Sequence, residues 1–183
     1  MENLIVIVGL PGSGKSFASD IIRKRFKARA FNTGDLIRDE IKRRGWKYTP
    51  ETDARIARWY HSEGREKLLI RRLFDKVRKT NRRLVVLDGL RSVEQLKHLK
   101  KCCKKKPVII YIKASFESRA RRELKRRRFG STETAEYIRF RDQLERSHGI
   151  MGLIRKADHT IDNNSLTMPQ FRREVIKTVK NIA

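Results

Sequence analysis

The chain has 183 residues and a formal net charge of +25, from 46 lysines and arginines against 21 acidic residues. This length fits one domain with a sizeable core, and no apolar run approaches the roughly 20 residues of a membrane-spanning helix. Because the N-terminus lacks a signal-peptide pattern, we expect a cytoplasmic protein without membrane contact, whose charge attracts a polyanion such as a nucleotide or RNA.

The N-terminal half of the chain predicts strands that alternate with helices. Residues 4–8 form a short, unbroken apolar run, which is typical of a buried strand. Apolar side chains three and four positions apart predict the helices, and we expect Thr33 or Asp35 to cap the second one. The expected elements are strands at 4–8 and 30–32, and helices at 16–27, 35–45 and 50–79, the last with a break at Gly64.

The C-terminal half of the chain continues this alternation. We expect strands at 84–87, 107–112 and 159–161, and helices at 93–103, 115–128, 132–147, 150–156 and 166–182. Alternating strands and helices predict parallel pairing with right-handed crossovers. Unbroken apolar strands agree with this, because a parallel sheet is covered by helices on both faces.

The most informative stretch follows the first strand. Gly9, four further residues and then Gly14, Lys15 and Ser16 fit the phosphate-binding loop pattern. Glycines let successive backbone N–H groups point at an anion, and the next helix adds its positive dipole end. Lys15 is expected to reach the β- and γ-phosphates of ATP, and the Ser16 hydroxyl to hold Mg²⁺. The predicted ATP-binding residues of the loop are Gly9, Pro11, Gly12, Ser13, Gly14, Lys15 and Ser16.

Ligands of such a sheet bind at the carboxyl ends of its strands, where two acidic residues occur. Asp88 follows the strand at 84–87 and is expected to hold Mg²⁺ together with Ser16; capping of a helix is its alternative role. Asp35 follows the strand at 30–32. It serves either as a helix cap or as the base that activates a hydroxyl acceptor.

Taken together, these motifs resemble the adenylate kinase group of nucleoside monophosphate kinases. The resemblance is closer to archaeal adenylate-kinase-related P-loop proteins, a UPF0200-like group, and covers nearly the whole chain. NTGDLIR at 32–38 is similar to the acceptor segment of these kinases, and LDGLR at 87–91 to their LDGFPR segment, one residue shorter. The resemblance implies a three-layer α/β/α P-loop NTPase with a five-stranded parallel sheet. It also implies one domain over 1–183, with an acceptor-binding insertion at about 33–80 and a lid at about 120–141.

The resemblance also implies the residues of the site. Arg122 and Arg126, one helical turn apart, would contact the donor and transferring phosphates, and Arg128 and Arg141 would form a second lid pair, with Arg139 a rival for Arg141. The closing segment, which resembles the adenine-contacting end of dephospho-coenzyme A kinases, adds Asn163 to the ATP site. The implied acceptor-binding residues are Thr33, Gly34, Arg38, Asp88, Gly89, Arg91 and Gln95.

Three functions remain open at this point. The first is phosphoryl transfer from ATP to a nucleoside monophosphate, with Mg²⁺ as cofactor and Lys15 and the lid arginines as catalytic residues. The second is another small-molecule kinase, with dephospho-coenzyme A or a deoxynucleotide as acceptor. The third is an RNA-associated P-loop ATPase, which the charge of +25 supports. Four aromatic residues could stack on a base, although packing in the core is the commoner role: Trp46, Tyr48, Trp59 and Tyr60.

Overall fold

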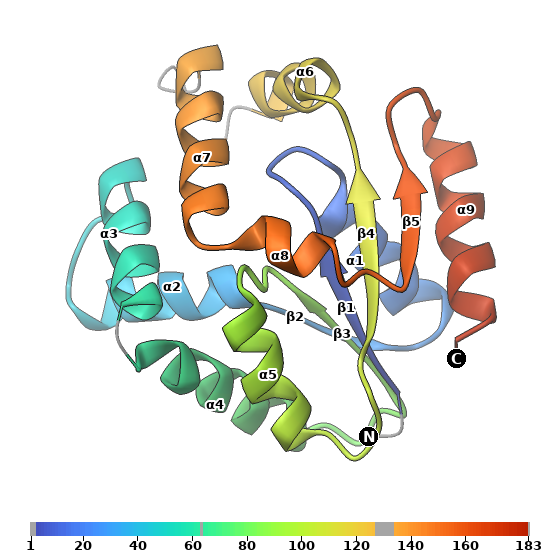
Figure 1. The fold of residues 1–183 in the computed structure, drawn as a ribbon, viewed down its shortest axis with the longest axis horizontal. Helices are drawn as coiled ribbons and strands as arrows, with labels where there is room; N and C mark the ends of the chain where they lie inside the picture. Colours follow the sequence, from blue (N-terminus) through green and yellow to red (C-terminus); the bar gives the residue numbers. More distant parts are fainter. Residues whose placement is uncertain (1–2, 63, 127–133, 183) are drawn as a thin grey trace.

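The core of the protein is a five-stranded parallel sheet with the strand order β2-β3-β1-β4-β5. The structure is a computed structural model that describes residues 3–62, 64–126 and 134–182. It confirms the predicted α/β P-loop architecture, in which helices cover both faces of the sheet (Figure 1). The strands are β1 (Asn3–Val8), β2 (Arg29–Asn32), β3 (Leu84–Asp88), β4 (Val108–Lys113) and β5 (His159–Asp162).

The helices form two layers and a roof. Helices α1 (Lys15–Arg25) and α9 (Met168–Lys180) pack on one face of the sheet. The roof is formed by α6 (Phe116–Arg126) and α7 (Ala135–Ser147), which lie above the carboxyl ends of the strands (Figure 1). The other face is covered by α2 (Thr33–Arg43), α3 (Pro50–His61), α4 (Arg65–Arg78), α5 (Val93–Cys102) and α8 (Ile150–Ile154).

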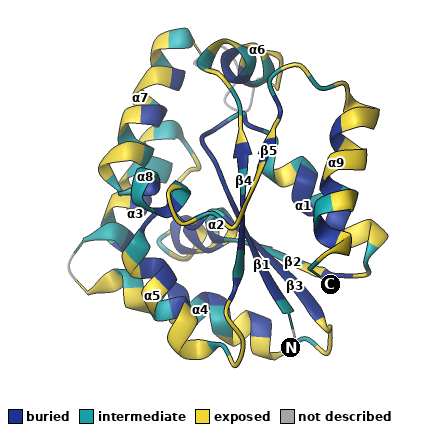
Figure 2. Ribbon diagram, turned by 45° about the vertical axis from the view of Figure 1, so that its right-hand side comes forward, coloured by how far each residue is buried: buried dark blue, intermediate teal, exposed yellow. Residues whose placement is uncertain are grey.

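The central strand β1 is apolar from Leu4 to Val8 because both of its faces are buried. Leu4, Val6 and Val8 pack in the core beneath α2 to α5, whereas Ile5 and Ile7 pack beneath α1 and α9. Successive side chains of a strand point to opposite faces, so a strand covered on both sides has no polar position. Figure 2 shows the same result, since the central strands are buried along most of their length.

The expected helix at 50–79 is two helices, α3 and α4, and the predicted break at Gly64 is confirmed: this residue has a left-handed φ of 70°. One detail of the predicted helices is wrong. The cap of α2 is Asn32, whose side chain accepts a hydrogen bond of 2.6 Å from the Gly34 N–H. Asn32 is the last extended residue before the helix, whereas Thr33 and Asp35 already lie inside it.

The end of the expected helix at 115–128 and the start of the next one lie outside the described residues. Within the described residues, α6 begins after Ser115, whose hydroxyl caps the helix by accepting a hydrogen bond of 3.3 Å from the Ser118 N–H. None of the described helices combines the length and the apolar character needed to span a bilayer.

Candidate phosphate-binding site

A cavity of about 550 Å³ opens at the carboxyl edge of the sheet, below α6 and α7. It brings together residues that lie far apart in the sequence. The phosphate loop lines its floor with Gly9, Pro11, Gly12, Gly14, Lys15 and Ser16. A second wall is lined by Gly34 and Arg38 of α2, by Asp88 at the end of β3, and by Gly89 and Arg91 just after it. The roof contributes Arg122, Arg126 and Arg141.

The phosphate loop needs glycine at two positions for steric reasons. Gly12 and Gly14 have φ angles of 76° and 105°, which L side chains rarely adopt. A Cβ atom at Gly12 would lie 2.6 Å from the Arg119 carbonyl oxygen, and one at Gly14 would lie 2.8 Å from Nδ2 of Asn163. The backbone is therefore wedged between α6 and the loop after β5. It keeps the curved form that a phosphate group requires.

Lys15 lies half-buried in this cavity at the start of α1. Its Nζ donates a hydrogen bond of 3.0 Å to the Leu10 carbonyl oxygen inside the loop. Burial lowers the pKa of Lys15, and the nearby carboxylate of Asp88 opposes that shift. A partly desolvated ammonium group with one hydrogen bond is well suited to exchange its carbonyl partner for a phosphate oxygen.

Asp88 and Ser16 fit a magnesium ion. The Ser16 hydroxyl and the Asn32 side-chain amide each donate a hydrogen bond of 3.1 Å to Oδ2 of Asp88. The other oxygen, Oδ1, is buried and has no hydrogen-bond partner among the described residues. Burial raises the pKa of Asp88, against the attraction of Lys15, and a bound cation would favour the ionised carboxylate. Mg²⁺ prefers such hard oxygen ligands, so these two residues have the chemistry to hold it.

Arg91 is held by an acid that sequence reasoning missed. Its Nε donates to both carboxylate oxygens of Glu145 on α7, at 2.9 and 2.8 Å. Burial works against both charges, but their mutual attraction is stronger. The pKa of Arg91 is raised and that of Glu145 is lowered, the latter also by Lys15. Nη1 of Arg91 is buried and finds no hydrogen-bond partner in the part of the chain that the structure describes, so this guanidinium can still bind an anion in the cavity.

Arg38 lies on the α2 side of the cavity. Burial opposes its charge, but hydrogen bonds to Asp35 and Tyr48 raise its pKa. Asp35 does not line the cavity; its carboxylate forms an ion pair with Arg38. Asp35 is therefore poorly placed to act as the base for an acceptor hydroxyl, which removes one of its two expected roles.

The predicted lid arginines meet around a second missed acid. Glu123 on α6 is only 4% exposed and accepts a hydrogen bond of 2.9 Å from Nη1 of Arg141, while Nη1 of Arg126 lies 3.8 Å away. Arg122 donates a hydrogen bond of 2.6 Å to the Asn163 carbonyl oxygen. All three arginines line the cavity, so a phosphate there would compete with Glu123 for Arg126 and Arg141, and with the Asn163 carbonyl for Arg122.

Arg139, the rival lid candidate, does not line this cavity. Arg139 lies over the ring of Phe116, 4.3 Å from its centroid, and lines a separate cavity. Of the two rivals, the structure therefore favours Arg141. Arg128 falls outside the described residues, and its predicted role stays a prediction.

Three predicted contact residues lie behind the cavity wall. The Thr33 hydroxyl donates a hydrogen bond of 2.7 Å to the Gly89 carbonyl oxygen, and the Gln95 side chain accepts one of 2.8 Å from the Arg91 N–H. The Asn163 amide donates one of 2.8 Å to the carbonyl oxygen of Ser13, which is itself 1% exposed. These side chains support the loops that line the cavity and do not line it themselves.

Known proteins match this chain in sequence over most of its length. A family model described as AAA domain matches residues 8–139. A UPF0200 protein from Hyperthermus butylicus is 32% identical over 179 residues, which cover 98% of this chain and 94% of the relative. The chain belongs to the UPF0200 family and carries an AAA domain. The predicted resemblance to that family is therefore confirmed.

Solved structures similar to this UPF0200 chain share its fold. A Thermus thermophilus protein is 20% identical with a TM-score of 0.63, and the match covers 98% of this chain and 97% of that chain. Shikimate kinase from Acinetobacter baumannii, solved with shikimate, is 17% identical with a TM-score of 0.54, over 100% of this chain and 93% of that chain. At these identities the likeness extends to the fold alone.

The UPF0200 chain also contains a half-buried pair of stacked histidines, His61 and His148. The rings of His61 and His148 stack with centroids 3.9 Å apart and planes 9° apart. Nδ1 of His61 lies 2.9 Å from Oε1 of Glu66. Burial lowers the pKa of both histidines to about 4; the charge of Arg91 adds to the effect at His61, and His61 itself adds to it at His148.

This pair predicts a loss of stability in mild acid. Between pH 6.5 and about 4 the unfolded chain binds protons at His61 and His148 that the folded chain does not. The free energy of unfolding should therefore fall as the pH drops, by up to about 1.4 kcal/mol per pH unit for each histidine. Urea denaturation at several pH values measures the slope. His148→Phe, which keeps a ring on His61, should make it shallower, and His159→Phe at an exposed position should not. An unchanged slope in His148→Phe would contradict the prediction.

Proposed function

We propose that the chain is an ATP-dependent kinase whose acceptor is a small molecule carrying a phosphate group, such as a nucleoside monophosphate. The observation that carries this proposal is Arg91. Its buried, unpartnered Nη1 shares one cavity with the phosphate-loop lysine, Lys15. An ATPase that transfers its phosphoryl group to water has no need of a second anion-binding group on the far wall. The kinase named among the proteins of the same fold supports the reaction class.

In the proposed reaction, an oxygen of the acceptor phosphate attacks the γ-phosphorus of ATP, and the bond to the β-phosphate oxygen breaks to release ADP. Lys15 exchanges the Leu10 carbonyl for phosphate oxygens and neutralises their charge. Ser16 and Asp88 would hold Mg²⁺, which supplies further neutralisation of the triphosphate when bound. The acceptor phosphate is already ionised, so the reaction requires no general base.

The positioning of the acceptor is assigned to Arg38 and Arg91, which bind phosphate through two parallel N–H groups. Glu145 holds the Arg91 guanidinium through Nε and leaves its other edge for the ligand. Arg122, Arg126 and Arg141 then cover the transferring group from the roof. In this proposal residues 33–80 form the acceptor-binding segment and residues 120–141 form the lid.

A second candidate is a kinase with a hydroxyl acceptor. Two carboxylates, Asp53 and Glu145, line the same cavity beside Arg91. Either one could accept the proton of an attacking hydroxyl, as in other kinases. Dephospho-coenzyme A remains an acceptor of this class, whereas a deoxynucleotide would present its phosphate as a nucleoside monophosphate does; the shared fold with shikimate kinase favours a wide choice of acceptors.

An acceptor screen decides between these functions. The purified chain with ATP and Mg²⁺ is offered each common nucleoside monophosphate, dephospho-coenzyme A or a deoxynucleotide, and products are separated by ion-exchange chromatography. The proposal expects a diphosphate and ADP in equal amounts from at least one monophosphate, above a Lys15→Ala control. Product from a hydroxyl acceptor alone would support the second candidate. ATP hydrolysis that no acceptor changes would contradict both kinase proposals.

A further inference from the structure

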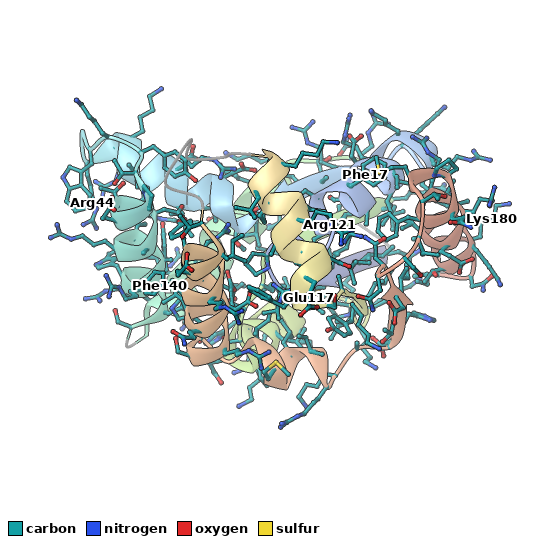
Figure 3. All side chains as sticks on the ribbon, turned by 90° about the horizontal axis from the view of Figure 1, so that it is seen from above. Phe17, Arg44, Glu117, Arg121, Phe140 and Lys180 are labelled. Atoms are coloured by element: carbon teal, nitrogen blue, oxygen red, sulfur yellow. The ribbon has the colours of Figure 1, made fainter. Side chains whose placement is uncertain are left out.

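Three arginines and two tryptophans form a continuous series of contacts at the edge of the molecule made by α2 and α3. The Arg55 guanidinium lies 4.5 Å from the centroid of the Trp46 ring, and the Arg44 guanidinium lies 5.2 Å from the same ring. Arg44 also lies 4.8 Å from the Trp59 ring, and Arg65 follows at 5.1 Å. We call these five residues the arginine–tryptophan stack. Figure 3 shows Arg44 at the outer edge of the molecule.

Local sequence spacing builds this stack. Arg55 and Trp59 are four residues apart on α3, so they share one face of that helix. Arg65 is the first residue of α4, and Arg44 and Trp46 flank Gly45 at the end of α2. Both tryptophans are partly buried and pack against the core beneath α2 to α5. The stack therefore rests on a rigid base and does not depend on a free loop.

Arg44 is also held in place by a buried carboxylate. Its Nε donates a hydrogen bond of 2.8 Å to the buried carboxylate of Glu40, which also binds Arg43 and Arg72. Hydrogen bonds from these arginines, that from Arg43 having the largest effect, lower the pKa of Glu40 to about 2 in spite of its burial. Three guanidinium groups around one carboxylate leave an excess of positive charge beneath the stack.

The charge around the stack is unbalanced in the sequence as well. Of the acids nearby, Asp53 lines the phosphate cavity and Glu66 pairs with His61, so neither neutralises the stack. The basic residues of segment 42–67 are Lys42, Arg43, Arg44, Lys47, Arg55, Arg58, Arg65 and Lys67, against Glu51, Asp53, Glu63 and Glu66.

We propose that the arginine–tryptophan stack is a binding surface for single-stranded nucleic acid. Indole rings hold the guanidinium planes in place, which leaves N–H groups at the plane edges for backbone phosphates. Arg55 and Arg65 at the two ends are exposed, and a guanidinium plane is a surface on which an unpaired base stacks. An anionic membrane surface would bind through charge alone and would not stack on the guanidinium planes. The surface is separate from the phosphate cavity and does not depend on the proposed kinase activity.

The chain offers a direct probe of this surface. It has two tryptophans, Trp46 and Trp59, and both belong to the stack. Intrinsic tryptophan fluorescence therefore reports on the stack and on no other part of the protein. Titration with a 12-nucleotide oligouridylate, without ATP and over a range of NaCl concentrations, should change this fluorescence at low salt. The affinity should fall steeply as salt rises.

Paired variants test the location. Arg55→Ala/Arg65→Ala should lower the oligonucleotide affinity at least about tenfold and reduce the salt slope by about 1.4, since each phosphate contact of a single strand contributes about 0.7. Arg172→Ala/Arg173→Ala removes the same charge from exposed positions on α9, the helix of Lys180 at the opposite end in Figure 3. This control should leave both values unchanged. Arg55→Lys/Arg65→Lys keeps the charge without the planes and should also weaken binding.

Three results would overturn the proposal. One is fluorescence that does not change with the oligonucleotide at any salt concentration. Another is an equal loss in the α9 variant, which would show that diffuse charge binds the strand. The third is that polyphosphate of matched charge binds as tightly as the oligonucleotide and loses the same affinity in the stack variants. That result would show a general anion site. Circular dichroism and thermal melting establish that each variant is folded, so that a loss of binding is not a loss of structure.

Discussion

Replacement of Lys15 by alanine should lower kcat of phosphoryl transfer by about 10³-fold, with the protein still folded. Lys15 is half-buried beside Asp88, and its partly desolvated charge interacts strongly with a transferring phosphoryl group. Removal of a single preorganised electrostatic partner in such a site typically costs 10²–10³-fold in kcat. The ammonium group is itself partly desolvated, so its removal relieves a cost and should not unfold the chain.

The measurement is a coupled assay with the acceptor that the screen identifies, at saturating ATP and Mg²⁺. Lys24→Ala is the matched control: it removes a lysine from the same helix, where its ammonium pairs with Asp20 at the surface. This variant should keep at least half of the wild-type kcat, because an exposed charge contributes little to the site. A Lys15→Ala protein that retains more than a tenth of the wild-type rate would contradict the assigned role.

Loss of one partner of the Arg119–Asp142 pair should be the most destabilising single change at the roof. The guanidinium donates two hydrogen bonds to the carboxylate, at 2.7 and 2.6 Å, and the side chains are only 3% and 11% exposed. Nη1 of Arg119 also donates to the Pro11 carbonyl oxygen at 3.1 Å, which ties α6 and α7 to the phosphate loop. Arg119→Met leaves a buried carboxylate unpaired and should lower the free energy of unfolding by about 3–5 kcal/mol.

Urea denaturation of a double-mutant cycle measures this effect. Arg119→Met combined with Asp142→Leu removes both charges, so its free energy of unfolding should lie well above that of Arg119→Met alone. Arg23→Ala at the surface pair with Asp20 serves as control and should cost less than about 1 kcal/mol. If Arg119→Met cost no more than this control, the pair would not hold the roof to the loop.

The fold and the donor half of the site follow from local sequence. The phosphate loop is one contiguous segment, so chain connectivity and glycine conformation already place Gly9, Gly14, Lys15 and Ser16 beside one another, before distant contacts hold the loop. The unbroken apolar strands likewise require helices on both faces, which leads directly to a parallel sheet. Asp88 could be expected in the cavity because it follows the strand paired with β1, at the edge where the loop begins.

The arrangement of the second half of the site was decided by tertiary contacts. Arg91 and Glu145 are 54 residues apart, and Glu123 and Arg141 are 18 apart, so no local spacing connects either pair. In a chain with 46 basic residues, spacing alone cannot tell which arginine meets a buried carboxylate. That choice depends on which helix face turns toward the sheet and on how α7 lies over the loop after β3. The acids Glu123 and Glu145 gave no signal of their own, because each stands among several arginines in sequence.

Tertiary contacts also explain why some predicted contact residues lie behind the cavity wall. Thr33 and Gln95 were expected to contact the acceptor, but both side chains turn inward to bond backbone groups of the segment at 89–91, which lines the cavity. His61 and His148 stack because α3 and α7 meet. Sequence patterns determine which segments reach the cavity, since strand order and loop position follow from local preferences. Which side chains face the ligand is decided by long-range packing, because a buried polar group must find a partner wherever the fold supplies one.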